Sequence, residues 1–346
     1  MACAGISYSL LNFTVAAEES EGLTASLEIP FWKFGLCLIM GFFMIPCGRG
    51  LDIRGWNEMN SFNGPIWTLT FEYIGNILYA LVFRHLPTVA LCIICAGTAI
   101  FTLDFTLGWD LFNMLPVKEF INEAGEVVTY GGPQYHVKGG WSLDPAQIYL
   151  GFTRLLYPFL CGLIISRILP KRSTAENPSG SPIRLKGGFI WTSLILITIL
   201  SVPCISGHDG VANGLYQAMM ILVAFPILVL MGAGSTIKSP ALTKVCKFLG
   251  DISYPIYITH YPLIYLHMGF VAEHPDVPTW IHAASAVGVF FFSIILAWGV
   301  FKAFDEPSRK WLTEHWLKGE QKLPMWLKVT AGVLVAAAVA LIIFKP

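Results

Sequence analysis

The chain has 346 residues, of which 55% are hydrophobic and only 13% are charged, and its formal net charge is zero. Soluble domains contain about 25% charged residues, so lipid rather than one soluble core must cover much of this apolar surface. Zero net charge provides no global attraction to nucleic acid. Most of the eight cysteines lie in apolar runs, where we expect small buried hydrophobes. We therefore predict an integral membrane protein with no nucleic-acid partner, no metal site and no bound cofactor.

Apolar stretches of about 17 to 25 residues are typical of transmembrane helices. In chain order they lie at 31–47, 64–83, 88–106, 148–166, 187–203, 212–232, 250–269, 279–301 and 326–344. A shorter uncharged run covers 1–17, and either this run or 31–47 is the first span if the N-terminus is cytoplasmic. The fold class predicted is an all-α integral membrane protein, a polytopic bundle of about 8–10 transmembrane helices.

Basic residues alternate between the loops. They are frequent at 167–186, 238–247 and 302–325 and rare at 204–211 and 270–278. The positive-inside rule then places the basic loops in the cytoplasm. By the same alternation the long loop at 107–147 lies outside, where it either contacts a substrate or caps the bundle.

Three ionisable side chains fall inside predicted spans, namely Glu72, Arg154 and His260. Such groups are costly in a membrane and indicate either a structural pair or a functional site. In the first interpretation, Glu72 and Arg154 neutralise each other between helices. In the second, they line a polar cavity, and His260 supplies a group that exchanges protons near neutral pH.

The segment before His260 has a polar stripe. Ser253, Tyr257 and His260 follow one another at spacings of four and three residues, so they share one helix face. A stripe of this kind belongs against protein or water rather than lipid. The segment before Glu72 begins with Gly64 and Pro65, a pair that typically starts a helix.

Four segments together resemble the acyltransferase family 3 membrane proteins, which O-acylate sugars and other cell-surface molecules. Residues 63–73 (NGPIWTLTFEY) resemble a W-S-L-x-x-E motif, with Thr68 in place of serine, and 151–154 (GFTR) resemble an arginine-bearing span. Residues 248–260 (FLGDISYPIYITH) are similar to L-G-x-x-S-Y-x-x-Y-x-x-H, and 305–311 (DEPSRKW) to E-x-P-x-R.

The front of the chain differs from the family pattern. Family members begin with an L-D-x-L-R-G segment, a histidine thought to act as base, a second span and a basic R-R-x-x-R-x-x-P loop, which are not found here. We expect residues 1–312 to form the acyltransferase family 3 domain without its first two spans, with 1–17 as the remainder of the next helix. Residues 313–346 are expected to carry an additional transmembrane helix.

The resemblance implies a multi-pass enzyme of the cytoplasmic (inner) membrane. It would move an acyl group, expected to be acetyl, from cytoplasmic acyl-CoA to a hydroxyl of a cell-surface carbohydrate or similar acceptor. We predict Glu72, Arg154 and His260 as catalytic residues, with Glu72 orienting groups or accepting protons and Arg154 stabilising charge. The predicted substrate-binding residues are Trp67, Ser253, Tyr254 and Tyr257.

Two alternatives remain open from the sequence. One is an inactive, truncated family member. The other is a transporter or flippase of small solutes, which predicts paired halves with discontinuous helices, whereas the sequence has no evident internal repeat.

Overall fold

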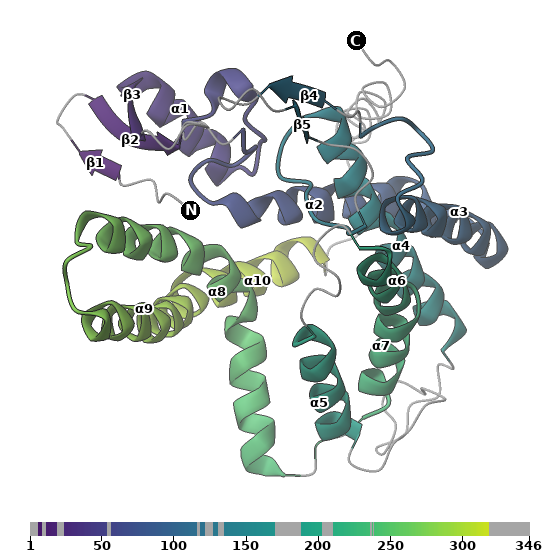
Figure 1. Ribbon diagram of the computed structural model, residues 1–346. Coiled ribbons are helices and arrows are strands. Elements are labelled where there is room, and N and C mark those ends of the chain that lie inside the picture. Colours follow the sequence, from purple (N-terminus) through teal and green to yellow (C-terminus); the bar gives the residue numbers. More distant parts are fainter. Residues whose placement is uncertain are drawn as a thin grey trace. The chain divides into compact units, whose positions relative to one another are not determined.

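The computed structural model describes residues 6–8, 12–18, 24–53, 57–115, 118–121, 127–130, 135–169, 188–202, 210–235, 237 and 239–317 (Figure 1). The chain divides into two compact units. Unit 1 comprises Met1–Thr70, Trp141–Leu143 and Ala241–Thr330. Unit 2 comprises Phe71–Gly140, Asp144–Pro240 and Ala331–Pro346.

Unit 1 begins with a small antiparallel sheet in the order β1 (Ile6–Tyr8), β2 (Asn12–Glu18) and β3 (Thr24–Pro30). In the register of β2 and β3, Thr14 lies opposite Glu28 and Val15 opposite Leu27. The expectation of a helical remnant at 1–17 is therefore wrong for 6–8 and 12–17, which are strands, whereas 1–5 and 9–11 lie outside the described residues. The short alternation of polar and apolar residues, as in Asn12-Phe13-Thr14-Val15, has the period of a strand.

The helices of unit 1 follow this sheet and return near the end of the chain. They are α1 (Phe31–Phe42), η1 (Arg49–Leu51), η2 (Gly64–Ile66), α8 (Pro240–Glu273), α9 (Thr279–Val300), η5 (Phe301–Asp305), α10 (Glu306–Leu312) and η6 (Thr313–Leu317). Helix α2 (Trp67–Leu81) starts in unit 1 and continues into unit 2. Cys37 on α1 forms a buried cluster with Cys47 and Ile53.

Unit 2 is a helical bundle with one hairpin. After α2 come η3 (Phe83–His85), α3 (Thr88–Leu107), the strands β4 (Lys118–Ile121) and β5 (Val127–Tyr130), α4 (Pro145–Ile168), α5 (Gly188–Leu200), α6 (Val211–Met219), the π-helical turn η4 (Met220–Ala224) and α7 (Phe225–Ala233). Helices α3 and α4 pack closely. Their shared core contains Leu91, Cys95 and Leu160 toward one end and Phe105, Tyr149 and Leu150 toward the other.

Within the described residues, five helical segments are long and apolar enough to cross a membrane. They are Gly64–His85, Thr88–Leu107, Pro145–Ile168, Val211–Ala233 and Thr279–His315. Each coincides with a span predicted from hydropathy, so the prediction of an all-α, multi-pass membrane protein is confirmed.

The other predicted spans have different outcomes. Those at 31–47 and 187–203 correspond to the shorter apolar helices Phe31–Phe42 and Phe189–Leu200. A twelve-residue helix is about 18 Å long, which is less than the hydrocarbon thickness of about 30 Å. The span at 250–269 lies within α8, which is not among the five, and 326–344 lies outside the described residues.

Candidate functional site

The segment before α2 is bonded to the middle of α8, both within unit 1. Pro262 has no N–H, so it cannot donate to the carbonyl of Ile258 one helical turn earlier. The side-chain amide of Asn63 donates to that carbonyl at 2.6 Å. A buried carbonyl needs a partner, and a proline in α8 thus creates a docking point for a residue 195 positions away.

Three more contacts complete this junction. The Tyr257 hydroxyl donates to the Pro65 carbonyl at 2.9 Å and also contacts the Thr68 hydroxyl. The Gly64 amide donates to the Tyr265 hydroxyl at 3.3 Å. A Cβ at Gly64 would lie 2.9 Å from that hydroxyl oxygen, so a side chain there would displace the Tyr265 hydroxyl from this bond. The junction fixes Tyr257 and the α8 turn that carries His260.

His260 is held in one tautomer by its own helix. Its Nδ1 lies 2.8 Å from the carbonyl oxygen of Ile256. A carbonyl can only accept a hydrogen bond, so in the neutral ring Nδ1 carries the proton and Nε2 has the lone pair. The Tyr257 and Tyr261 rings flank the imidazole, with centroids at 6.1 and 5.6 Å. The geometry therefore leaves Nε2 as the proton-accepting atom.

A cavity of about 540 Å³ lies beside this imidazole, between α8 and α9. Ser253, Tyr257 and His260 contribute to its α8 wall, and Ser293 contributes a hydroxyl from α9. The three residues predicted to share one helix face are thus brought together on one cavity wall. The cavity is mostly apolar and includes two histidines, His260 and His267, and a few hydroxyl groups, which suits a ligand with a small polar part.

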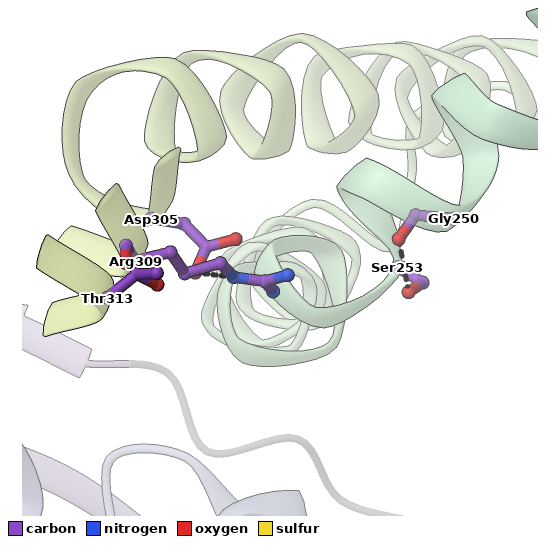
Figure 2. Close-up of polar contacts among 5 residues, drawn as sticks. All are labelled: Gly250, Ser253, Asp305, Arg309 and Thr313. Atoms are coloured by element: carbon purple, nitrogen blue, oxygen red, sulfur yellow. Dashed lines mark hydrogen bonds and ion pairs between the residues drawn. The ribbon is translucent and has the colours of Figure 1, made fainter. Parts of the chain in front are cut away.

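The other predicted substrate-binding residues of unit 1 lie elsewhere. Tyr254 is 43% exposed and does not line this cavity, whereas Trp67 is 8% exposed and belongs to the buried core. The Ser253 hydroxyl donates to the Gly250 carbonyl at 2.8 Å (Figure 2).

The segment that resembles E-x-P-x-R forms ion pairs along its own helix. Arg309 donates to Asp305 at 2.8 Å, and Thr313 donates to the Arg309 carbonyl at 2.7 Å (Figure 2). Lys302 and Lys310 pair with Glu306 at 2.8 and 3.2 Å. These i,i+4 pairs support the helix locally.

Arg154 is positioned by a glycine turn in unit 2. Its Nη1 donates to the Gly139 carbonyl at 2.8 Å. Gly139 and Gly140 have φ angles of +139° and +103°, values that favour glycine. The Gly140 amide donates to the Gln147 side chain at 2.6 Å, which ties the turn to the start of α4. This turn presents a carbonyl oxygen to the guanidinium.

Two of the recognised segments meet in unit 2. A Cβ on Gly151 would lie 2.2 Å from the Phe71 ring, so only glycine admits that ring against α4. Phe71 also packs edge-on against Phe152, with ring centroids 5.3 Å apart. The close approach fixes Phe71 of α2 against the α4 turn that leads to Arg154.

Glu72 follows Phe71, but its side chain is exposed. It does not line the cavity beside His260, and none of the ion pairs between described residues joins it to Arg154. The structure therefore places Glu72, Arg154 and His260 on three different helices, α2, α4 and α8.

Asp104 is a buried carboxylate that the sequence interpretation overlooked. It is 3% exposed and accepts hydrogen bonds from the Tyr149 hydroxyl at 2.9 Å and the Leu111 amide at 2.8 Å. An ionisable residue inside an apolar run indicates a structural or functional role, and this pattern could have identified Asp104 from the sequence. Because it joins α3 to α4 and to the loop after α3, we assign it a structural role.

The comparison with known families covers three of the four recognised segments, since 305–311 lies beyond the matched residues. The acyltransferase domain model matches residues 2–302, and the chain belongs to this family. A similar protein is the putative peptidoglycan O-acetyltransferase YrhL of Bacillus subtilis (strain 168), with 26% identity over 127 residues. That match covers 36% of this chain and 20% of the relative, so the chain spans about a fifth of its length. No solved structure matches the chain.

Proposed function

We propose that this protein is a membrane O-acyltransferase of the cytoplasmic membrane. It moves an acyl group, expected to be acetyl, from cytoplasmic acyl-CoA to a hydroxyl of a cell-surface carbohydrate. The observation that carries the proposal is the His260 tautomer, whose Nδ1 is bonded to the Ile256 carbonyl at 2.8 Å while the ring borders a large cavity. Membership of the acyltransferase domain family and the name of the relative support the reaction and the acceptor class.

The proposed reaction uses His260 as general base. The acceptor hydroxyl gives its proton to Nε2 as its oxygen forms a bond to the acyl carbonyl carbon. The carbon–sulfur bond to coenzyme A then breaks, and the proton passes to the departing thiolate. A positioned base of this kind contributes about 10²- to 10⁴-fold. Arg154 is proposed to stabilise negative charge on the acyl donor, as preorganised cations do.

The test replaces His260 in cells that otherwise lack surface O-acyl groups. Full-length protein and H260Q would be produced at equal levels, and alkali-released acetate would be measured from the isolated envelope. We expect H260Q to lower acylation by about 10²-fold or more. H274Q is the matched control, because His274 also bonds a carbonyl four residues earlier but does not line the cavity.

Each outcome bears on the proposal. Undiminished acylation in H260Q would remove His260 as the base. An equal loss in H274Q, one residue beyond the end of α8, would show that replacing a histidine that bonds a carbonyl of this helix is enough to disturb folding. If the unaltered chain adds no acyl group, the enzyme proposal itself fails, and the inactive or transport alternatives are favoured.

Glu72 remains a proposed catalytic residue, and its replacement has a separate test. If Glu72 orients groups or accepts protons, E72Q keeps its size but removes the charge, and acylation falls. Glu58 is not a suitable comparison because it contacts the junction, so exposed Glu273 serves as the matched position. Acylation in E72Q equal to that in E273Q would rule out the role of Glu72.

A further inference from the structure

A second cavity, of about 360 Å³, lies entirely within unit 2. Helix α4 forms one wall from Thr153 to Ile165, and the π-helical turn η4 with α7 forms the opposite wall from Ile221 to Val229. Twelve residues separate Thr153 from Ile165 on α4, which corresponds to about 18 Å along the helix axis. The cavity is therefore an elongated slot between two helices.

Backbone features of both walls keep the slot open. Gly162 lines it, and a Cβ built there would meet nothing within 4 Å. On the opposite wall, Pro226 has no N–H for the Leu222 carbonyl, and the Tyr157 hydroxyl donates to that carbonyl at 2.7 Å instead. The helices are thus joined by one cross-helix bond beside an unfilled space.

The two ends of the slot differ in polarity. At one end are Thr102, Thr153 and Arg154, whereas Ile165, Phe225 and Val229 line the rest with hydrocarbon. Thr102 is 1% exposed, and its Oγ1 has no hydrogen-bond partner among the described residues. A buried hydroxyl without a partner is costly, so a ligand that supplies an acceptor oxygen here would be stabilised.

An acyl chain has the matching chemistry. Its carbonyl oxygen accepts hydrogen bonds from Thr102 and Arg154, and its hydrocarbon tail fills the apolar length of the slot. Each buried methylene group improves binding about fourfold. An acetyl group would leave most of the slot empty, and a sugar would leave its hydroxyls against hydrocarbon.

We propose that this slot is an acyl-chain subsite that lets the protein use donors with chains of several carbons alongside acetyl. The carbonyl end of the chain lies at Thr102 and Arg154, and the tail runs between α4 and α7 toward Ile165 and Val229. This inference rests on the proposed acyltransferase function and deepens it by naming the class of acyl donor.

The first experiment compares acyl donors in membranes that contain the full chain, with acetyl-CoA, hexanoyl-CoA and octanoyl-CoA. We expect G162L, which fills the slot, to reduce octanoyl transfer at least about tenfold more than acetyl transfer. G97L is the matched control, because Gly97 is also an exposed helical glycine with open space at its Cβ but lies outside the slot. An unchanged octanoyl-to-acetyl ratio in G162L would overturn the inference.

The second experiment measures whether an acyl chain occupies the slot, independently of acyl transfer. An octanoyl-CoA with a diazirine near the chain end would be photolysed with the membranes, and labelled peptides would be mapped. We expect label on α4 and α7 near Ile165 and Val229, lost with excess octanoyl-CoA and in G162L. Label on the same residues from a diazirine phospholipid that octanoyl-CoA does not displace would mean that bilayer lipid occupies the slot, and the inference would fail.

The two proposals fail in different ways. If no donor is transferred but octanoyl-CoA still protects the slot from labelling, the enzyme proposal fails and the subsite stands as a binding site. If acetyl is transferred and the slot remains unlabelled, the enzyme proposal stands and the subsite does not.

Discussion

Helix α8 in unit 1 carries His260 and helix α4 in unit 2 carries Arg154, and the two helices hold these groups by different means. On α8, His260 is fixed by a carbonyl of the same helix. Hydrogen bonds to the side chains of Asn63 and Thr68, the Gly64 amide and the Pro65 carbonyl brace the surrounding turns. On α4, Arg154 is fixed by the Gly139 carbonyl from a preceding turn. The surrounding turn of α4 is held by the Phe71 ring, which packs closely against Gly151.

Both adjoining cavities are mostly apolar and differ in the polar groups that they contain. The one beside His260 has serine, tyrosine and histidine side chains in its walls, whereas the slot beside Arg154 has two threonines and the arginine at one end. Unit 1 therefore offers a base beside hydroxyl groups, and unit 2 offers a cation at the end of an apolar slot. Both use a proline in the same manner, because Pro262 and Pro226 each leave a carbonyl that a distant side chain occupies.

The largest effect is expected when the charge of Arg154 is removed. Arginine provides a delocalised cation with several donors, so we expect R154Q to lower acyl transfer by about 10²- to 10³-fold. R154K keeps the positive charge but lacks the planar guanidinium, so its rate of acyl transfer should fall between those of the unaltered protein and R154Q. Initial rates in membranes with matched protein levels would measure this.

The control for Arg154 lies on the same helix. Arg167 donates to the Leu86 and Phe83 carbonyls at 2.6 and 3.0 Å, and it therefore joins the end of α4 to the connection between α2 and α3. R167Q should change thermal stability more than turnover. Full activity in R154Q would show that unit 2 contributes no charge to the reaction.

A second prediction concerns packing at glycine in unit 2. A Cβ on Gly214 would lie 1.8 Å from the Thr106 carbonyl oxygen, which is backbone and cannot rotate away. We expect G214A to lower the free energy of unfolding by about 1–3 kcal/mol or more. The melting temperature of the purified protein in detergent measures this change.

Gly232 provides the control for Gly214. A Cβ there would lie 3.9 Å from the Thr192 methyl group, an ordinary contact. G232A should therefore leave the melting temperature close to its original value. Equal stability in G214A would mean that α3 and α6 do not approach as closely as the structure shows.

The smallest expected effect comes from the proline-dependent bond in unit 1. N63A removes the partner of the Ile258 carbonyl and should cost about 1–3 kcal/mol of stability. In a P262A background the helix supplies its own N–H to that carbonyl, so the same replacement should cost less. The difference between the two costs is the coupling free energy, which a double-mutant cycle measures.

Tyr157 and Pro226 in unit 2 test whether a proline creates a docking point for a side chain there as well. Y157F in the presence and absence of P226A should show the same coupling, because Tyr157 donates to the carbonyl that Pro226 leaves. Additive effects in both pairs would rule out the idea that these prolines create docking points for other helices.

Local signals allowed several features to be predicted from the sequence. Hydropathy depends on composition over one helix length, and it located the five long apolar segments. The family was recognised from short segments, three of which lie within the matched residues 2–302, and the shared face of Ser253, Tyr257 and His260 follows from helical spacing. The strands near the N-terminus were missed because uncharged composition was read without its period of two.

Tertiary structure decided what the side chains do. The bond from Asn63 to Ile258 joins residues 195 positions apart, and no local pattern predicts such a pairing. One partner of Arg154 is a backbone carbonyl, and because every residue has a carbonyl, no residue type in the sequence indicates this contact. The slot in unit 2 exists because two helices meet at glycine and proline without filling the space between them. Sequence thus determined which residues enter the membrane, whereas packing over long separations determined which of them face a cavity and which atom of each remains available.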